Sequence, residues 1–158
     1  ITIYMNIQER TQKYKGKFTP NNPSKYIGDS DNIIYRSMWE RRCMKYFDTN
    51  PSVLGWASEE VSIPYYDTMT KKVRRYFPDF LIKVKDKNGK LKTHLIEVKP
   101  TKDLRPPVGG RGKKRSTVLY EAKTYQMNRD KFASARKWCD ERNITFDIWT
   151  EKHLQMKG

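Results

Sequence analysis

Three side chains in this sequence have the types and spacing needed for metal-assisted cleavage of a phosphodiester bond. Asp79 follows Pro78, and eighteen residues later the tripeptide Glu97-Val98-Lys99 adds a second carboxylate and an ammonium group. Magnesium prefers oxygen ligands and keeps several waters, so one or two carboxylates, a backbone carbonyl and a phosphate oxygen complete its shell. Asp79, Glu97 and the Val98 carbonyl are therefore predicted to hold Mg²⁺, with Mn²⁺ as an alternative.

Lys99 is predicted to supply the catalytic ammonium. Side chains alternate along a strand, so Glu97 and Lys99 project from one face while Val98 points to the other. A lysine beside a metal site can position or deprotonate the attacking water and offset charge in the transition state. A half-exposed hairpin with solvated charges is the alternative, since 32% of the residues are charged. Against it, Asp79 and Glu97 lie in aromatic or apolar runs, where unpaired charge is costly.

Two strand-like runs must bring these groups together. Residues 73–82 and 93–99 are rich in β-branched, aromatic and aliphatic side chains. The segment between them carries Asn88-Gly89, which is a turn signal typical of hairpins. We therefore expect an antiparallel hairpin on which the two acidic positions lie side by side.

A helix over residues 37–49 is predicted ahead of this hairpin. Ser37 and Glu40 have the spacing of a capping box, and Asn50-Pro51 ends the helix. Spacing of i, i+3, i+4 and i+7 places Glu40 on an otherwise apolar stripe with Cys43, Met44 and Phe47. Glu40 thus has two roles open to it, as a cap or as a third catalytic and metal-ligating carboxylate.

Four further polar residues have both a chemical and an ordinary explanation. Glu59 and Glu60 could reach the metal site from the entrance of a strand, and a solvated pair explains them equally well. Lys123 and Gln126 lie three residues apart on a predicted helix, from which they could reach a scissile phosphate. Ordinary surface positions also account for these two.

The composition favours a nucleic-acid partner. Lys and Arg number 33 against 18 Asp and Glu, so the net charge is +15 and the pI is near 9.8. Such an excess suits a polyanion, because neutralising phosphates releases counterions. No apolar run of transmembrane length is present, so double-stranded DNA is expected as a partner and a membrane is not. The two cysteines form no C-x-x-C motif and are expected to be reduced, as in an intracellular protein.

The chain is predicted to form one α/β domain over residues 26–158, with a small mixed β-sheet flanked by helices. Residues 1–25 lack periodicity and are expected to be an extended basic N-terminal arm. The other expected elements are strands at 60–65 and 144–149, a helix at 117–142 and a short helix from 151. Residues 101–116 are expected to form a mobile basic loop, whose predicted DNA-binding residues are Arg111, Lys113, Lys114 and Arg115. A solvated turn is the alternative for this loop.

The order of an acidic residue on a helix, then Pro-Asp, then Glu-x-Lys resembles the PD-(D/E)xK nuclease superfamily, which implies a restriction-endonuclease-like core. Over roughly residues 17–152 the chain is also similar to the head completion proteins of T-even-type tailed bacteriophages. This likeness is carried by Tyr35-Arg36-Ser37-Met38-Trp39-Glu40, Trp56-Ala57-Ser58-Glu59, Ile63-Pro64-Tyr65, Arg74-Arg75-Tyr76-Phe77 and Ile96-Glu97-Val98-Lys99-Pro100. Asn128, Asp130-Lys131 and residues 144–151 fit it too. A weaker likeness extends to the endonuclease subunit of heteromeric transposases.

The resemblance implies Glu40, Asp79 and Glu97 as metal ligands and Lys99 as the catalytic ammonium of a magnesium-dependent DNA endonuclease. It also implies a virion protein at the head–tail neck, assembled in the host cytoplasm. There it would process or secure the packaged DNA end, with portal, neck and tail proteins as partners. A non-catalytic DNA-binding plug or connector is the alternative, and a basic domain that binds the portal through its arm is compatible with either. Intact Asp79, Glu97 and Lys99 favour the nuclease, because acidic groups facing phosphate weaken binding.

Overall fold

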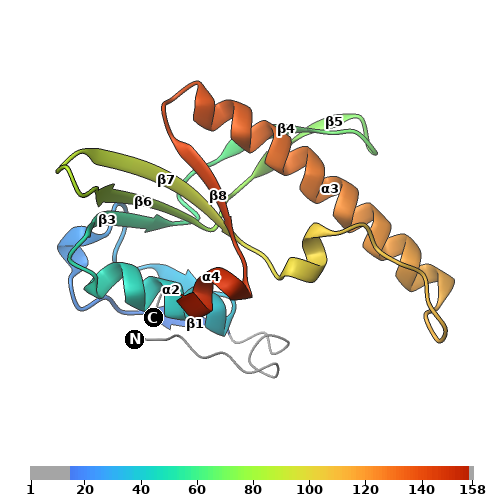
Figure 1. The fold of residues 1–158 in the computed structure, drawn as a ribbon, viewed down its shortest axis with the longest axis horizontal. Helices are drawn as coiled ribbons and strands as arrows, with labels where there is room; N and C mark the ends of the chain where they lie inside the picture. Colours follow the sequence, from blue (N-terminus) through green and yellow to red (C-terminus); the bar gives the residue numbers. More distant parts are fainter. Residues whose placement is uncertain (1–14, 157–158) are drawn as a thin grey trace.

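A four-stranded sheet forms the centre of the protein in this computed structural model, which describes residues 15–156 (Figure 1). The strands, in spatial order, are β3 (Val53–Ser58), β6 (Phe80–Lys85), β7 (Leu91–Val98) and β8 (Thr145–Trp149). β6 pairs antiparallel with β3 and β7, whereas β8 is parallel to β7. A parallel neighbour needs a crossover connection, and η2 (Thr101–Leu104) and α3 (Arg115–Asp140) provide it.

Helices cover the two faces of this sheet. Alternate residues of β7 point to opposite faces, so Ile96 joins one core cluster and Leu95 the other. The first cluster includes Phe47 of α2 (Met38–Thr49), and the second includes Phe132 of α3. The predicted mixed sheet flanked by helices is therefore confirmed.

Smaller elements complete the domain. A two-stranded sheet of β4 (Ile63–Asp67) and β5 (Lys72–Tyr76) packs against α3, so that Tyr65 and Tyr76 join the same cluster as Phe132. The remaining elements are β1 (Gly16–Phe18), which pairs with β2 (Ile33–Tyr35), the short η1 (Pro23–Lys25), and α4 (Glu151–Met156) after β8.

The strand expected over residues 73–82 is two strands in different sheets. β5 ends at Tyr76, and β6 begins at Phe80 after the break at Phe77-Pro78-Asp79. Proline lacks the N–H that a continuous ladder needs, so the chain leaves one sheet there and enters the next. The hairpin itself is confirmed, because β6 and β7 pair antiparallel.

The predicted boundary at residue 25 is wrong for the described part of the arm. Phe18 is buried in the core, and Asp48 accepts N–H bonds from Asn21 (2.7 Å) and Asn22 (3.0 Å). Residues 15–25 therefore belong to the domain, while residues 1–14 of the predicted arm lie outside the described residues. The 101–116 loop is also shorter than expected, since η2 and the start of α3 leave 105–114 as the connection.

Candidate active site

The register of the β6–β7 hairpin places Asp79 beside Glu97. Phe80 pairs with Ile96, so the preceding residue on one strand faces the following residue on the other. The Asp79 N–H donates to Glu97 Oε2 (3.3 Å), and the Val98 N–H donates to Asp79 Oδ2 (2.8 Å). The two acidic positions lie side by side, as the hairpin predicted.

Glu97 is the most enclosed carboxylate of this group, with 6% of its surface exposed. The Tyr76 hydroxyl donates to its Oε2 at 2.7 Å, and Lys99 Nζ lies 3.4 Å from its Oε1. The Lys99 ammonium is thus on the same face as the acidic pair, in agreement with the strand alternation. Tyr76 was not predicted as a site residue, because its partner is reached through tertiary packing of β5.

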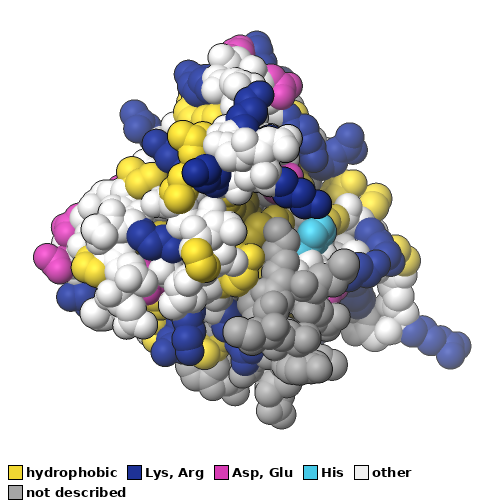
Figure 2. Space-filling model, turned by 60° about the vertical axis from the view of Figure 1, so that its left-hand side comes forward, with side chains coloured by type: hydrophobic (Ala, Val, Ile, Leu, Met, Phe, Trp, Pro, Cys, Tyr) yellow, Lys and Arg dark blue, Asp and Glu magenta, His cyan; other side chains and the backbone are white. Residues whose placement is uncertain are grey.

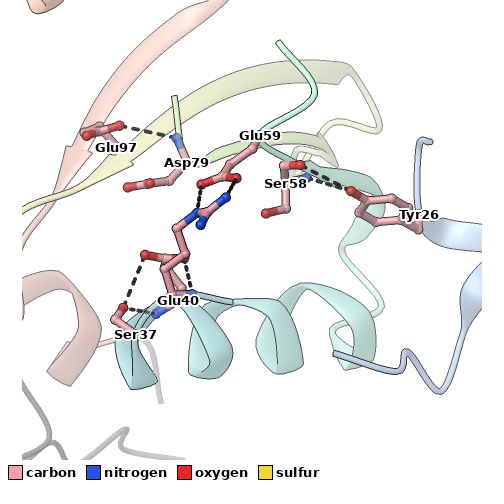
Figure 3. A network of polar contacts seen from close by, with 8 residues as sticks. Tyr26, Ser37, Glu40, Ser58, Glu59, Asp79 and Glu97 are labelled. Carbon is pink, nitrogen blue, oxygen red and sulfur yellow. Dashed lines mark hydrogen bonds and ion pairs between the residues drawn. The ribbon is translucent and has the colours of Figure 1, made fainter. Parts of the chain in front are cut away.

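Glu40 joins the group from the first turn of α2, below Asp79 and Glu97 (Figure 3). Its N–H donates to Ser37 Oγ (3.2 Å), and its Oε2 accepts the Arg36 N–H (2.9 Å). Glu40 therefore takes part in the N-terminal cap of α2. Glu40 also lies near enough to Asp79 for its charge to raise the pKa of that carboxyl, so one side chain serves the cap and faces the site.

At the carboxyl groups of Asp79 and Glu40, burial and the negative charge of neighbouring carboxylates outweigh the nearby positive charge. Burial raises the pKa of Asp79 well above its ordinary value, the charges of Glu97 and Glu40 raise it further, and the Val98 N–H and Lys99 oppose the rise. Burial raises the pKa of Glu40 too, with a smaller contribution from the charge of Glu59. Oxygen donors of this kind suit a hard divalent cation.

The fit to a metal rests on a pair of carboxylates and a carbonyl. Within residues 15–156, no three His, Cys, Asp or Glu side chains converge on a single point as a ready-made metal cluster. Asp79 and Glu97 are linked through backbone N–H bonds, and Val98 lies beside them. Two carboxylates and a carbonyl meet the needs of Mg²⁺, which takes its other ligands from water and substrate.

Glu59 and Glu60 are engaged with other side chains. The Arg36 guanidinium pairs with both Glu59 oxygens, from Nε to Oε1 at 2.9 Å and from Nη2 to Oε2 at 3.2 Å. Glu60 Oε1 accepts a bond from the Tyr26 hydroxyl at 3.1 Å. Glu59 has a φ of 55°, and its N–H donates to the Asp79 carbonyl (3.1 Å). Glu59 therefore borders the site and fixes the backbone of Asp79.

Lys131 of α3, which the sequence analysis named only as part of the resemblance and not as a site residue, also borders the acidic group. Its Nζ lies 5.5 Å from the ring centre of Tyr76 and 5.8 Å from that of Tyr65. Burial lowers its pKa, as does the charge of Lys99, while Glu97 and Asp79 oppose the change. No residue in 15–156 gives the Lys131 ammonium a hydrogen bond or a carboxylate partner in contact. The available signal was helical spacing, which puts Lys131 on the face of the buried Ala135.

Lys123 and Gln126 fit the explanation that does not involve the scissile phosphate. Gln126 donates to Asp130 Oδ1 (3.0 Å), and Asp130 in turn accepts bonds from Thr68. Lys123 is exposed on the surface of α3. Neither contacts the acidic group of the site.

The predicted DNA-binding residues lie away from the sheet. Arg111, Lys113, Lys114 and Arg115 are exposed where the 105–114 connection enters α3, at the end of the helix that projects beyond the domain body (Figure 1). Lys113 is 3.0 Å from Glu121, so one of the four charges is partly balanced. On the face shown in Figure 2, Lys and Arg side chains are widely spread and acidic ones are few.

Two comparisons with known proteins each match more than half of the chain. Residues 50–151 match the family model described as the N-terminal domain of TnsA-like endonucleases. The chain is also 40% identical over 150 residues to the head completion nuclease of Enterobacteria phage T4, covering 92% of this chain and 96% of that protein. The matched family region contains Asp79, Glu97 and Lys99, while Glu40 precedes it. Among the described residues, no helix is long and apolar enough to cross a membrane.

Proposed function

This chain belongs to the family of TnsA-like endonucleases and is a homologue of a phage head completion nuclease, and from this premise we propose that it is a Mg²⁺-dependent DNA endonuclease. The observation that carries the proposal is the pair of the half-buried Asp79 and the buried Glu97, with Lys99 Nζ 3.4 Å from Glu97. In a protein of net charge +15, a site where the carboxylates outnumber the cations in contact with them is best explained by a bound metal ion.

Different residues of the chain bind the metal and orient its ligands in this proposal. Asp79, Glu97 and the Val98 carbonyl hold Mg²⁺ or Mn²⁺, and Glu40 completes the anionic group from α2. When bound, such an ion lowers the pKa of a coordinated water and offsets charge on the phosphate. The Tyr76 hydroxyl and the Asp79 N–H both bond Glu97 Oε2, so they fix the orientation of that carboxylate.

Two lysines supply positive charge for the substrate. Lys99 lies against Glu97, where its ammonium positions the attacking water and offsets negative charge on the phosphate. Lys131 rests on the faces of Tyr65 and Tyr76, where no hydrogen-bond acceptor competes for it among the described residues. We assign Lys131 to a phosphate oxygen of the bound DNA. Cation–π contacts hold an ammonium in place and leave its hydrogen-bond donors available for such an oxygen.

The proposed biological setting is taken from the name of the phage T4 relative. As a head completion protein, it would work on virion DNA after packaging, at the neck where portal and tail meet. There it would trim or secure the end of the double-stranded DNA before the tail attaches. Its high positive charge supports a DNA partner, because phosphate neutralisation supplies affinity without sequence preference.

Cleavage of linear and supercoiled DNA by the purified protein tests the enzymatic part. We expect cleavage with Mg²⁺ or Mn²⁺, none with EDTA, and none from Asp79→Ala or Lys99→Ala. Because both positions lie beside the core, binding of DNA in EDTA serves as the folding control for each variant. A well-folded parent that binds DNA but does not cleave it with either metal would instead point to a non-catalytic DNA-binding plug.

A further inference from the structure

A groove outside the acidic site runs along α3. Two hollows of about 530 Å³ and 360 Å³ share Asp103, Tyr125 and Asn128, so together they form one groove between α3 and residues 102–108. We call it the α3 groove. Each hollow is within the size range of sites that enclose small ligands. Lys102, which lines it, lies three residues after Lys99.

The groove is positively charged, and several of its cations have no carboxylate partner. Its basic residues are Lys102, Arg105, Lys113, Arg129 and Arg136, against the acidic Asp103 and Glu121. The Arg129 guanidinium lies 5.9 Å from the ring centre of Tyr125, and that of Arg136 lies 5.7 Å from Phe146. Aromatic rings hold these cations and leave their donors available for an anion.

Two tyrosine side chains lie among the basic residues of the groove. Tyr120 is 70% exposed, and Tyr125 is partly exposed about 1.4 turns further along the helix. The two residues are about 7.5 Å apart along the helix axis. Basic side chains that alternate with open aromatic faces are typical of sites for single-stranded nucleic acid, where bases stack on the rings.

Asn128 adds a polar side chain to the groove. Its side chain lines both hollows and only 6% of the residue is exposed, yet nothing in the described part of the chain hydrogen-bonds its amide. The amide offers two donors and an acceptor, and the edge of an unpaired base can meet them.

We propose that the α3 groove binds unpaired nucleotides, so that the preferred substrate is duplex DNA with a single-stranded segment. The proposal rests on the proposed nuclease function, since it specifies the form of its DNA. In an intact duplex the bases are paired and stacked, so Tyr120 and Asn128 have nothing to contact. An unpaired strand offers phosphates to the arginines and bases to the tyrosines and the amide.

Binding measured in EDTA by fluorescence anisotropy tests this independently of catalysis. The probes are a single strand, a blunt duplex, and a duplex with a single-stranded tail. We expect tailed and single-stranded DNA to bind more tightly than blunt duplex. Tyr120→Leu and Tyr125→Leu should each weaken binding of these two probes about tenfold and leave blunt duplex unchanged. Tyr120→Phe should keep the affinity, because stacking needs the ring and not the hydroxyl.

Tyr66→Leu is the matched control, because Tyr66 is 51% exposed on β4 and does not line the groove. Equal losses for tailed and blunt DNA would overturn the proposal and leave only a phosphate-binding surface. Unchanged binding of every probe would also overturn it, and would leave the groove to a protein partner. Failure of the nuclease function has a different signature, namely a protein that discriminates among the probes in EDTA and cleaves none of them with metal.

Discussion

The surroundings of Asp79 in the folded protein favour its protonated form more than water does. Burial raises its pKa well above the ordinary 3.8, and the charges of Glu97 and Glu40 add to that rise. Between about pH 3.8 and the raised pKa of Asp79, the folded protein therefore binds more protons than the unfolded chain. Stability of the metal-free protein consequently falls as the pH rises from about 3.8 through the raised pKa.

Asp79→Asn removes this titration and keeps an oxygen that can accept the Val98 N–H. In EDTA we expect the variant to melt at a higher temperature than the parent near about pH 8, and the gap to close toward about pH 4. Thermal unfolding followed by circular dichroism at several pH values measures the gap. A parent as stable as the variant at the alkaline end would show that the Asp79 charge carries no penalty.

Lys131 gives a second test at the scale of one side chain. If its ammonium binds a phosphate oxygen, Lys131→Met should lower kcat/KM for DNA by about a hundredfold, as the loss of a preorganised donor does elsewhere. Lys131→Arg should recover part of the affinity for DNA, because it restores the charge. Lys137→Met, an exposed position on the same helix, is the control for lost charge. Equal effects of the two methionine variants would contradict a specific role for Lys131.

Elements whose signals are local were predictable from the sequence. Helix α2 begins after its capping serine and ends before Pro51, and the β6–β7 hairpin turns at Gly89, which has a φ of 78°. Both depend on a few neighbouring residues. The hairpin alone placed Asp79 against Glu97, so the centre of the site could be predicted before any tertiary contact was known.

Elements that depend on tertiary partners could not be predicted in the same way. β3 is buried at Gly55, Trp56 and Ala57 in succession, so the alternation that identifies a half-exposed strand is missing. The Arg36–Glu59 pair and the contact of Lys131 with Tyr76 join segments far apart in the chain. Such contacts follow from how α2, β5 and α3 pack, which no local pattern specifies.

The first turn of α2 allows the two roles of Glu40 to be separated. Ser37→Ala removes the cap and should cost about 1 kcal/mol of stability, measured by urea unfolding. Glu40→Gln keeps a side chain that suits the third position of a capping box, so it should fold normally. Glu40→Gln should nevertheless lose most metal-dependent cleavage, because the amide removes a negative charge beside the proposed metal-binding pair. Full activity in Glu40→Gln would restrict Glu40 to the cap.

At the scale of the whole molecule, the acidic site lies beside the middle of α3, near Lys131, whereas the basic connection lies at the N-terminal end of that helix. The site is beside the sheet, and residues 105–114 lie where the helix projects from the domain body (Figure 1). A DNA partner that touches both would run along the helix. Cations far from the reacting phosphate would then contribute affinity, while the proposed catalytic residues Asp79, Glu97 and Lys99 would contribute the chemistry.

This division predicts how salt affects binding. Replacing Arg111, Lys113, Lys114 and Arg115 by Ser should flatten the slope of log K against log salt by about 3, since each phosphate contact contributes about 0.9 and Lys113 already pairs with Glu121. The exposed hairpin lysines Lys83, Lys85, Lys87 and Lys90, replaced in the same way, are the control with equal charge loss. Anisotropy titrations with duplex DNA in EDTA, over a range of salt concentrations, give both slopes. If the two sets flatten the slope equally, the 105–114 connection adds only general positive charge. If the connection variant flattens the slope more than the hairpin variant, the connection is a path for the DNA backbone toward the acidic site.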